Sequence, residues 1–195
     1  MSGPLRLTFV KSVSDHRDLP ELPAEVAVVG RSNVGKSSLI NALANHKHLA
    51  KVSKTPGRTQ LINLFVLSND TGMVDLPGYG YAAVPGKIRA GWGKMIESYL
   101  IERESLVEVL VLVDGEIGPT KLDVQMIEYL QANDVPLQIV ATKHDKVKSS
   151  KRDTRKRDLA AGCGVAQREV MWVSADSGVG IDALRGHIIG VLKDE

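Results

Sequence analysis

The sequence predicts an α/β protein in which a mostly parallel six-stranded sheet with one antiparallel strand lies between two layers of helices. Three observations lead to this fold. Apolar, strand-like runs alternate with helical patterns along the chain, apart from one hairpin. A glycine-rich string, G-x-x-x-x-G-K-S at residues 30–37, follows the first buried run and opens a helix. The other short motifs also follow buried runs directly, at the carboxyl ends of strands, where open α/β sheets bind ligands.

The composition is typical of a single globular domain covering residues 1–195. The chain is 43% hydrophobic and 25% charged, and its net charge of +2 by itself demands neither nucleic acid nor anionic lipid as a partner. No run approaches the ~18 apolar residues of a membrane span, and the N-terminus lacks the apolar core of a signal peptide. The single cysteine, Cys163, cannot form an internal disulfide, which fits a reducing compartment. We therefore expect a cytoplasmic monomer with no membrane partner.

The first part of the chain places the glycine-rich string between a strand and a helix. Weak alternation at residues 5–10 indicates a short strand or edge segment, and a loop over 15–23 leads to a buried strand at 25–29. A helical pattern then runs from 36 to 44. Residues 45–60 are polar and without periodicity, and a loop of this length is usually functional or mobile.

The glycine-rich string has the chemistry of a phosphate-binding loop. Gly30 and Gly35 allow the backbone to curl so that successive N–H groups point at phosphate oxygens. The helix that follows turns its positive end toward the same anion. Lys36 adds a charge at the β- and γ-phosphates, and the Ser37 hydroxyl can ligate Mg²⁺. We therefore expect a P-loop NTPase sandwich whose loop binds nucleotide through Gly30, Arg31, Ser32, Asn33, Val34, Gly35, Lys36 and Ser37.

A hairpin follows, with strands predicted at residues 61–67 and 73–75, and it runs into Asp75-Leu76-Pro77-Gly78. An aspartate at a strand end, about 40 residues after a phosphate-binding loop, is suited to hold Mg²⁺ through a water molecule. The Gly78 N–H is placed to bond the γ-phosphate, and loss of that phosphate would release the segment after it. We expect Asp75, Leu76, Pro77 and Gly78 to contact the nucleotide or its metal ion.

The second half of the chain continues the alternation of helices and strands. In the first of its helices, Trp92, Ile96, Tyr99 and Leu100 form an apolar stripe at helical spacing. The predicted strands cover residues 107–113, 135–141 and 170–173, and the predicted helices cover residues 87–103, 122–133, 149–161 and 181–192.

Thr142-Lys143-His144-Asp145 follows a predicted strand and indicates which base is bound. A carboxylate at this place accepts two hydrogen bonds from the N1–H and 2-amino groups of guanine, a donor pair that adenine lacks. The Lys143 stem can lie over the purine face, and Ser174-Ala175 can offer a backbone N–H to guanine O6. The predicted base-binding residues are Thr142, Lys143, His144, Asp145, Val173, Ser174 and Ala175.

Together, these strings resemble the bacterial EngB family, also called YihA or YsxC, of the TrmE-Era-EngA-EngB-septin-like superfamily. The resemblance runs from Glu25 to Leu192 and rests on residues 30–38, 55–60, 75–82, 142–145 and 174–175. The string Asp-Leu-Pro-Gly-Tyr-Gly-Tyr-Ala at 75–82 is close to diagnostic among GTPases. The resemblance implies binding of GTP or GDP with Mg²⁺, slow hydrolysis, a role in large (50S) ribosomal subunit assembly, and a link to cell division and septation.

The resemblance also implies roles for individual residues. Ser37 and Thr59 would ligate Mg²⁺, and Thr59 is preferred over Thr55 because it ends the family's Pro-Gly-Arg-Thr string. Thr142 stands where many GTPases have asparagine, but threonine is common in this family. Lys36, Thr59 and Gly78 would be the catalytic residues. The first switch would consist of Gly57, Arg58, Thr59, Gln60 and Leu61.

The residues around the hydrolysis site leave alternatives open. Many GTPases place a water-orienting glutamine directly after the D-x-x-G motif, but here that position is Tyr79, so we expect slow intrinsic turnover. Asn33 occupies the place where related GTPases hold K⁺, and it either does the same or braces the loop. Arg58 is either a charge donor within the chain or an ordinary surface arginine.

A basic segment at residues 146–157 has two interpretations, a solvated helix face or a contact with rRNA phosphates. It lacks aromatic residues, so base-specific recognition is not expected. His46 and His48 lie in a loop without the acids or cysteines of a metal site. The cations of the basic segment are Lys146, Lys148, Lys151, Arg152, Arg155, Lys156 and Arg157.

Three functions compete on these residues. The first is a GTPase switch that acts on the ribosome. The second is a non-hydrolysing GTP/GDP sensor that binds a division or assembly partner, a possibility that Tyr79 keeps open. The third, an ATP-dependent kinase, is disfavoured by Asp145.

Overall fold

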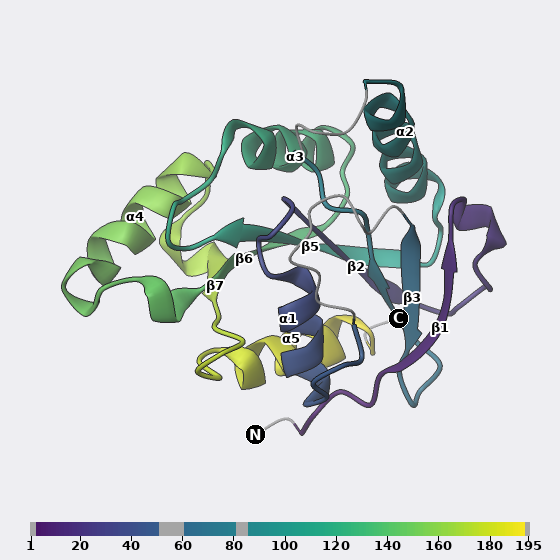
Figure 1. The fold of residues 1–195 in the computed structure, drawn as a ribbon, viewed down its shortest axis with the longest axis horizontal. Coiled ribbons are helices and arrows are strands. Elements are labelled where there is room, and N and C mark those ends of the chain that lie inside the picture. Colours follow the sequence, from purple (N-terminus) through teal and green to yellow (C-terminus); the bar gives the residue numbers. More distant parts are fainter. Residues whose placement is uncertain (1–2, 51–60, 81–85, 194–195) are drawn as a thin grey trace.

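A twisted sheet of seven strands in the order β1-β3-β4-β2-β5-β6-β7 runs through the computed structural model, which describes residues 3–50, 61–80 and 86–193 (Figure 1). For residues 86–92 only the backbone is described. Strand β3 is antiparallel to both of its neighbours, and the remaining neighbouring pairs are parallel. The strands are β1 (Thr8–Val13), β2 (Glu25–Gly30), β3 (Ile62–Val66), β4 (Gly72–Asp75), β5 (Leu106–Asp114), β6 (Leu137–Thr142) and β7 (Val170–Trp172).

Helices cover both faces of the sheet, which gives three layers. In Figure 1, α1 and α5 lie below the sheet, α2 and α3 lie above it, and α4 lies beyond the β7 edge. None of the helices in the described residues is long and apolar enough to cross a bilayer. The helices are α1 (Lys36–Ala44), α2 (Gly86–Glu102), α3 (Lys121–Ala132), α4 (Arg152–Gly162) and α5 (Ile181–Val191).

The central strand β5 shows how the sequence produces these layers. Val109, Val111 and Val113 point to the face covered by α2 and α3, whereas Leu110 and Leu112 point to the face covered by α1 and α5. Because alternate side chains of a strand point to opposite faces, a strand buried on both sides is apolar throughout. This confirms the predicted α/β sandwich.

The number of strands differs from the prediction, because the sheet has seven strands and not six. The additional strand, β1, lies at the edge and covers residues 8–13, whereas the sequence suggested residues 5–10. Of its side chains only Val13 is buried, and a bulge between Phe9 and Lys11 shifts the pairing with β3. An exposed edge strand with a bulge carries little hydrophobic alternation, so its sequence signal is weak.

The other elements agree with the predictions to within a few residues. Strand β6 begins at Leu137, because Pro136 has no N–H to donate to a sheet. Helix α4 begins at Arg152 after a separate 3₁₀ turn, Ser149–Lys151. In the predicted stripe on α2, Ile96, Tyr99 and Leu100 are buried, and the Trp92 side chain lies outside the described residues.

Candidate nucleotide-binding site

Four of the predicted motifs meet at one edge of the sheet. Strands β4, β2, β5, β6 and β7 are parallel, so their carboxyl ends lie on the same side. The glycine-rich loop follows β2, Asp75 ends β4, Thr142 ends β6, and Ser174 follows β7 by one residue. The topology therefore gathers residues from distant parts of the chain into one candidate site.

The glycine-rich loop turns sharply and ends at a helix that lacks a side-chain cap. Gly35 has φ 108° and Asn33 has φ 66°, both in the left-handed region. Val34 is buried, and a Cβ on Gly30 would lie 2.8 Å from its Cγ1, so this position requires glycine. In the described residues, no side chain caps the first turn of α1. The first N–H groups of α1 are therefore available to an anion.

The Lys36 ammonium lies beside Gly78, which is 42 positions further along the chain. A Cβ on Gly78 would lie 3.2 Å from Lys36 Nζ and 3.1 Å from Ser32 Oγ. Only glycine leaves this space open. A group bound by the loop and by Lys36 therefore lies within reach of the D-x-x-G backbone.

Asp75 is a buried carboxylate with one unused oxygen. It is 4% exposed, and its Oδ1 has no hydrogen-bond partner in the part of the chain that the structure describes. Burial raises the pKa of Asp75, while the Lys36 charge and a hydrogen bond with Asn63 oppose this rise. Buried polar atoms are nearly always satisfied, and carboxylate oxygens and metal-bound water are the usual partners of Mg²⁺. The donor set here fits a hydrated Mg²⁺ ion.

Several predicted residues of the first switch fall outside the described residues. These are Gly57, Arg58, Thr59 and Gln60, together with Thr55. Leu61 is described; it is 40% exposed and directly precedes β3.

Asp145 lies at the other end of the site as a prepared hydrogen-bond acceptor. Its Oδ1 accepts a hydrogen bond from Ser174 Oγ at 2.6 Å, and its Oδ2 lies 3.1 Å from Lys146 Nζ. The Ser174 hydrogen bond lowers the pKa of Asp145, which keeps the carboxylate ionised. Ser174 is held in turn by the Ser177 N–H, at 3.0 Å.

The Thr142–Asp145 segment is joined to the glycine-rich loop and to the residue that follows β7. Thr142 Oγ1 donates to the carbonyl of Val34 at 2.7 Å, and the His144 N–H donates to the carbonyl of Val173 at 3.1 Å. These bonds fix the base-binding motif relative to the phosphate-binding loop.

The sequence analysis assigned no role to two carboxylates at this edge. Asp114 ends β5 and lies 2.6 Å from Lys143 Nζ, and Asp123 accepts a hydrogen bond from the Tyr79 hydroxyl at 2.9 Å. Position at a strand end was a usable signal for Asp114. The Thr120-x-x-Asp123 spacing is a helix-capping pattern, but nothing local marked the contact with Tyr79, which is 44 residues away.

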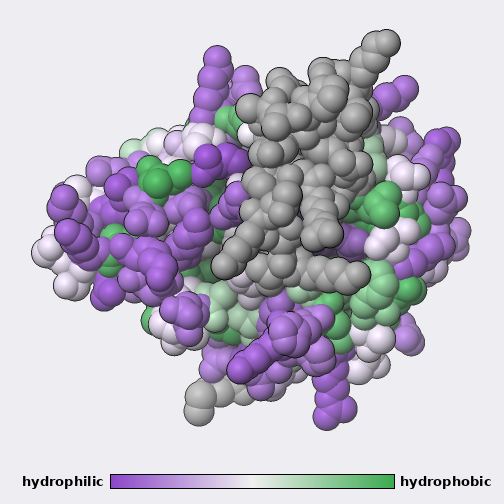
Figure 2. Space-filling view, viewed as in Figure 1, coloured by the Kyte–Doolittle hydropathy of each residue, from purple (hydrophilic) through white to green (hydrophobic). Residues whose placement is uncertain are grey.

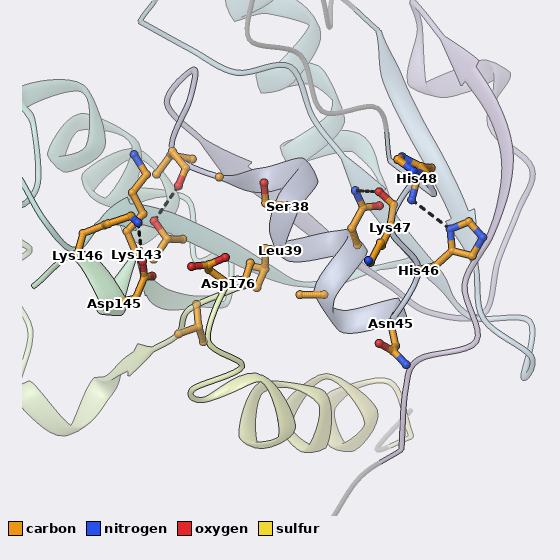
Figure 3. A pocket seen from close by; sticks show the side chains of 17 residues that line it. Ser38, Leu39, Asn45, His46, Lys47, His48, Lys143, Asp145, Lys146 and Asp176 are labelled. Carbon is orange, nitrogen blue, oxygen red and sulfur yellow. Dashed lines mark hydrogen bonds and ion pairs between the residues drawn. The ribbon is translucent and has the colours of Figure 1, made fainter.

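A cavity of about 670 Å³ connects the base-binding motif with the far end of α1. Figure 3 shows Lys143, Asp145 and Asp176 at one end, Ser38 and Leu39 of α1 between, and His46, Lys47 and His48 at the other end. The histidine-containing loop is held by Asn41, which bonds the carbonyls of Lys47 and Ala50 and the N–H of Ala50.

The basic segment lies next to the base-binding motif. Figure 2 shows a hydrophilic surface over α4, on the left of the molecule. Lys146, Lys148, Lys151 and Arg157 are exposed, and Arg155 is half-buried, with its Nη1 3.4 Å from the Ile117 carbonyl. The segment therefore presents several cations to solvent.

Comparison with known proteins gives a consistent result. Residues 25–143 match the protein family described as 50S ribosome-binding GTPase. The probable GTP-binding protein EngB of Desulforamulus reducens is 51% identical over 162 residues, which are 82% of this chain and 79% of that protein.

Two solved structures share the fold. A crystal structure of a probable GTP-binding protein EngB matches 88% of this chain and 100% of its own, with a TM-score of 0.72 and 26% identity. NFeoB from S. thermophilus, bound to GDP·AlF4⁻ and K⁺, matches 85% of this chain and 61% of its own, with a TM-score of 0.63 and 24% identity. The second likeness concerns the fold alone.

Proposed function

The chain belongs to the EngB family of GTPases, and on that premise we propose that it is a Mg²⁺-dependent GTP switch that acts in large ribosomal subunit assembly. One observation carries the switch proposal: Lys36 Nζ lies against Gly78, so one γ-phosphate can contact both the glycine-rich loop and the D-x-x-G backbone. Loss of that phosphate removes the one ligand group that both segments would share. We further propose that the whole chain, residues 1–195, forms one G domain.

The triphosphate is bound by the loop from Gly30 to Ser37 and by the first turn of α1. Mg²⁺ is held by Ser37 and Thr59 directly and by Asp75 through water, a proposal that the unused Asp75 oxygen supports. When bound, the ion neutralises charge that develops on the β- and γ-phosphate oxygens. Lys36, Thr59 and the Gly78 N–H stabilise the transferring phosphoryl group. We keep the sequence-based assignment of Arg58, Gln60, Leu61, Leu76 and Pro77 to the nucleotide site.

Guanine is bound by the second group of motifs. Asp145 accepts hydrogen bonds from N1–H and the 2-amino group, and its ionised state supports that role. The Lys143 stem covers the purine face, and the Ala175 N–H bonds O6. Thr142, His144, Val173 and Ser174 hold these groups in place, as their mutual hydrogen bonds suggest.

Intrinsic hydrolysis is slow in this proposal. Tyr79 occupies the position of the water-orienting glutamine, and its hydroxyl is directed to Asp123 and not toward a nucleotide. Two roles stay open for Asn33, which either coordinates K⁺ or braces the loop in its left-handed conformation. Hydrolysis rates in KCl and in NaCl decide between them.

The partner in this proposal is the large ribosomal subunit or its assembly precursor, contacted in the cytoplasm by a monomer. The family description and the exposed cations of residues 146–157 support it, since lysine and arginine neutralise rRNA phosphates. A link to cell division and septation would then follow indirectly from ribosome assembly. Membership in a GTPase family weighs against the alternative, a non-hydrolysing sensor with a division or assembly partner.

Sedimentation with purified 50S subunits tests this function. The protein is mixed with subunits and a non-hydrolysable GTP analogue, GDP or an ATP analogue. We expect co-sedimentation with the GTP analogue only, and its loss in Lys36→Ala. Equal sedimentation in all three states, or none despite intact GTP binding, would contradict a ribosome-directed switch.

A further inference from the structure

Tyr79 is joined through its backbone to the phosphate-binding loop. Its N–H donates to the carbonyl of Gly30 at 3.3 Å, and its carbonyl accepts from the N–H of Ser32 at 3.0 Å. These bonds form a short parallel bridge between Arg31 and Tyr79. The residue directly after Gly78 is therefore attached to the loop.

The side chain of Tyr79 is joined to a different layer of the molecule. Its hydroxyl donates to Asp123 Oδ1 at 2.9 Å. Asp123 is 1% exposed, and its Oδ2 accepts from the N–H and the hydroxyl of Thr120, both at 2.8 Å, in the capping box of α3. Burial, the neighbouring Asp123 charge and this hydrogen bond raise the pKa of Tyr79, which keeps its phenolic proton in place as the donor. The capping box therefore holds the Asp123 carboxylate in place independently of Tyr79.

Other residues pack closely against the backbone on both sides of Tyr79. Gly80 has φ 81°, and a Cβ there would lie 2.9 Å from Leu122 Cδ1 and 3.2 Å from Arg31 Cγ. On the other side, the space at Gly78 is limited by Ser32 and Lys36. Helix α3 is itself anchored in the core by Ile127 and Leu130.

We propose that Tyr79 and Asp123 are positioning residues that hold the Gly78 N–H at the place of the γ-phosphate. The inference rests on the proposed function, in which Gly78 contacts that phosphate. Fixing a binding group in its bound geometry reduces the ordering cost of binding. GDP lacks the γ-phosphate, so this effect applies to GTP and not to GDP. If the Tyr79–Asp123 hydrogen bond only stabilised the fold, its loss would weaken the binding of GTP and GDP equally.

The test uses Tyr79→Phe, which removes one hydroxyl and keeps the ring, and Asp123→Asn, which removes the charged acceptor. Affinities for GDP and a non-hydrolysable GTP analogue are measured by titration calorimetry, with thermal melting to verify folding. We expect each variant to lose about fivefold to tenfold in affinity for the GTP analogue, with GDP affinity within about twofold of wild type. The double variant is expected to lose little more than the more affected single variant, because both substitutions act on the same hydrogen bond.

The matched control is Tyr129→Phe, the same substitution at a tyrosine of α3 six positions after Asp123, which should leave both affinities unchanged. Equal losses for GTP analogue and GDP, or no loss for either, would overturn the positioning role. Wild-type protein that binds neither nucleotide would instead overturn the proposed function, so the two failures are distinguishable.

Discussion

The Lys143 ammonium lies 2.6 Å from a carboxylate oxygen of Asp114, which is 4% exposed at the end of β5. Lys143 has φ 56°, and the other oxygen of Asp114 accepts hydrogen bonds from the N–H groups of Glu116 and Ile117. The ion pair directs the charged end of Lys143 to the sheet edge, which leaves its aliphatic stem along the cavity wall.

We predict that Asp114→Asn weakens GDP and GTP binding about threefold to tenfold, because Lys143 loses the partner that orients it. Fluorescence titration measures the affinities, and a double-mutant cycle with Lys143→Met tests the coupling. Asp134→Asn is the control, since Asp134 is exposed and its φ of 54° suits asparagine. Additive losses in the cycle would show that the pair does not act in binding.

Asp145→Asn is expected to change base preference. An asparagine amide cannot accept two hydrogen bonds from the guanine N1–H and 2-amino groups, but its N–H can donate to the 2-carbonyl of xanthine. We predict a loss of at least about 100-fold for GDP and a gain for xanthosine diphosphate. Competition assays measure both, and Asp176→Asn, on the same cavity, is the control. Unchanged GDP affinity would place the base elsewhere.

Some positions of the sequence motifs coincide with local backbone requirements that the structure shows. Gly30, Gly35 and Gly78 are such positions, because their backbones leave no room for, or no easy conformation with, a side chain. Asp114 and Asp123 received no role, because they act on residues 29 and 44 positions away. Only the strand order and helix packing bring those partners together.

The hydrophobic pattern predicted the strands in the core of the sheet better than the strand at its edge. Strand β5 is apolar on both faces and its pattern is unambiguous. Strand β1 exposes all its side chains except Val13, so hydrophobicity cannot define its limits. The hydrogen bonds of Asn41 to the loop at Lys47–Ala50 could not be predicted either, because asparagine in a helix usually has no such partner.

Glu25 forms a buried network that should matter for stability. It is 0% exposed and accepts hydrogen bonds from Tyr99 Oη at 2.6 Å and Arg103 Nε at 2.9 Å. We predict that Arg103→Met lowers the free energy of unfolding by about 3–5 kcal/mol, because it leaves a buried carboxylate without its counter-charge. Urea denaturation measures this. Arg17→Met, which breaks the exposed pair with Asp15, should lower the free energy of unfolding far less. Equal losses of unfolding free energy in the two variants would contradict this prediction.

Stability should also depend on His187, whose Nε2 lies 2.7 Å from Glu108. The hydrogen bond to Glu108 raises the pKa of His187 above its ordinary value of 6.5. The folded protein therefore holds this proton more tightly than the unfolded chain. The resulting stabilisation is complete below the unfolded pKa and is lost as pH rises through the folded pKa.

We therefore expect wild-type protein to lose up to about 1 kcal/mol of stability relative to His187→Gln as the pH rises from weakly acidic to weakly basic values. Parallel urea titrations of the two proteins across this range measure the difference. Identical pH profiles would show that the His187–Glu108 pair adds nothing to folding.

The basic segment should contribute an electrostatic, salt-dependent part of ribosome binding. Each phosphate contact releases counterions, so losing a contact lowers the slope of log affinity against log salt concentration by about one. We predict that a triple variant of exposed cations binds 50S subunits more weakly and with a shallower salt slope, while GDP affinity is unchanged. The test variant is Lys148→Gln, Lys151→Gln and Arg157→Gln, and the control is Lys94→Gln, Lys121→Gln and Lys193→Gln, which removes as many exposed cations elsewhere. Equal slopes for the two variants would mean that net charge, and not the basic segment, determines binding.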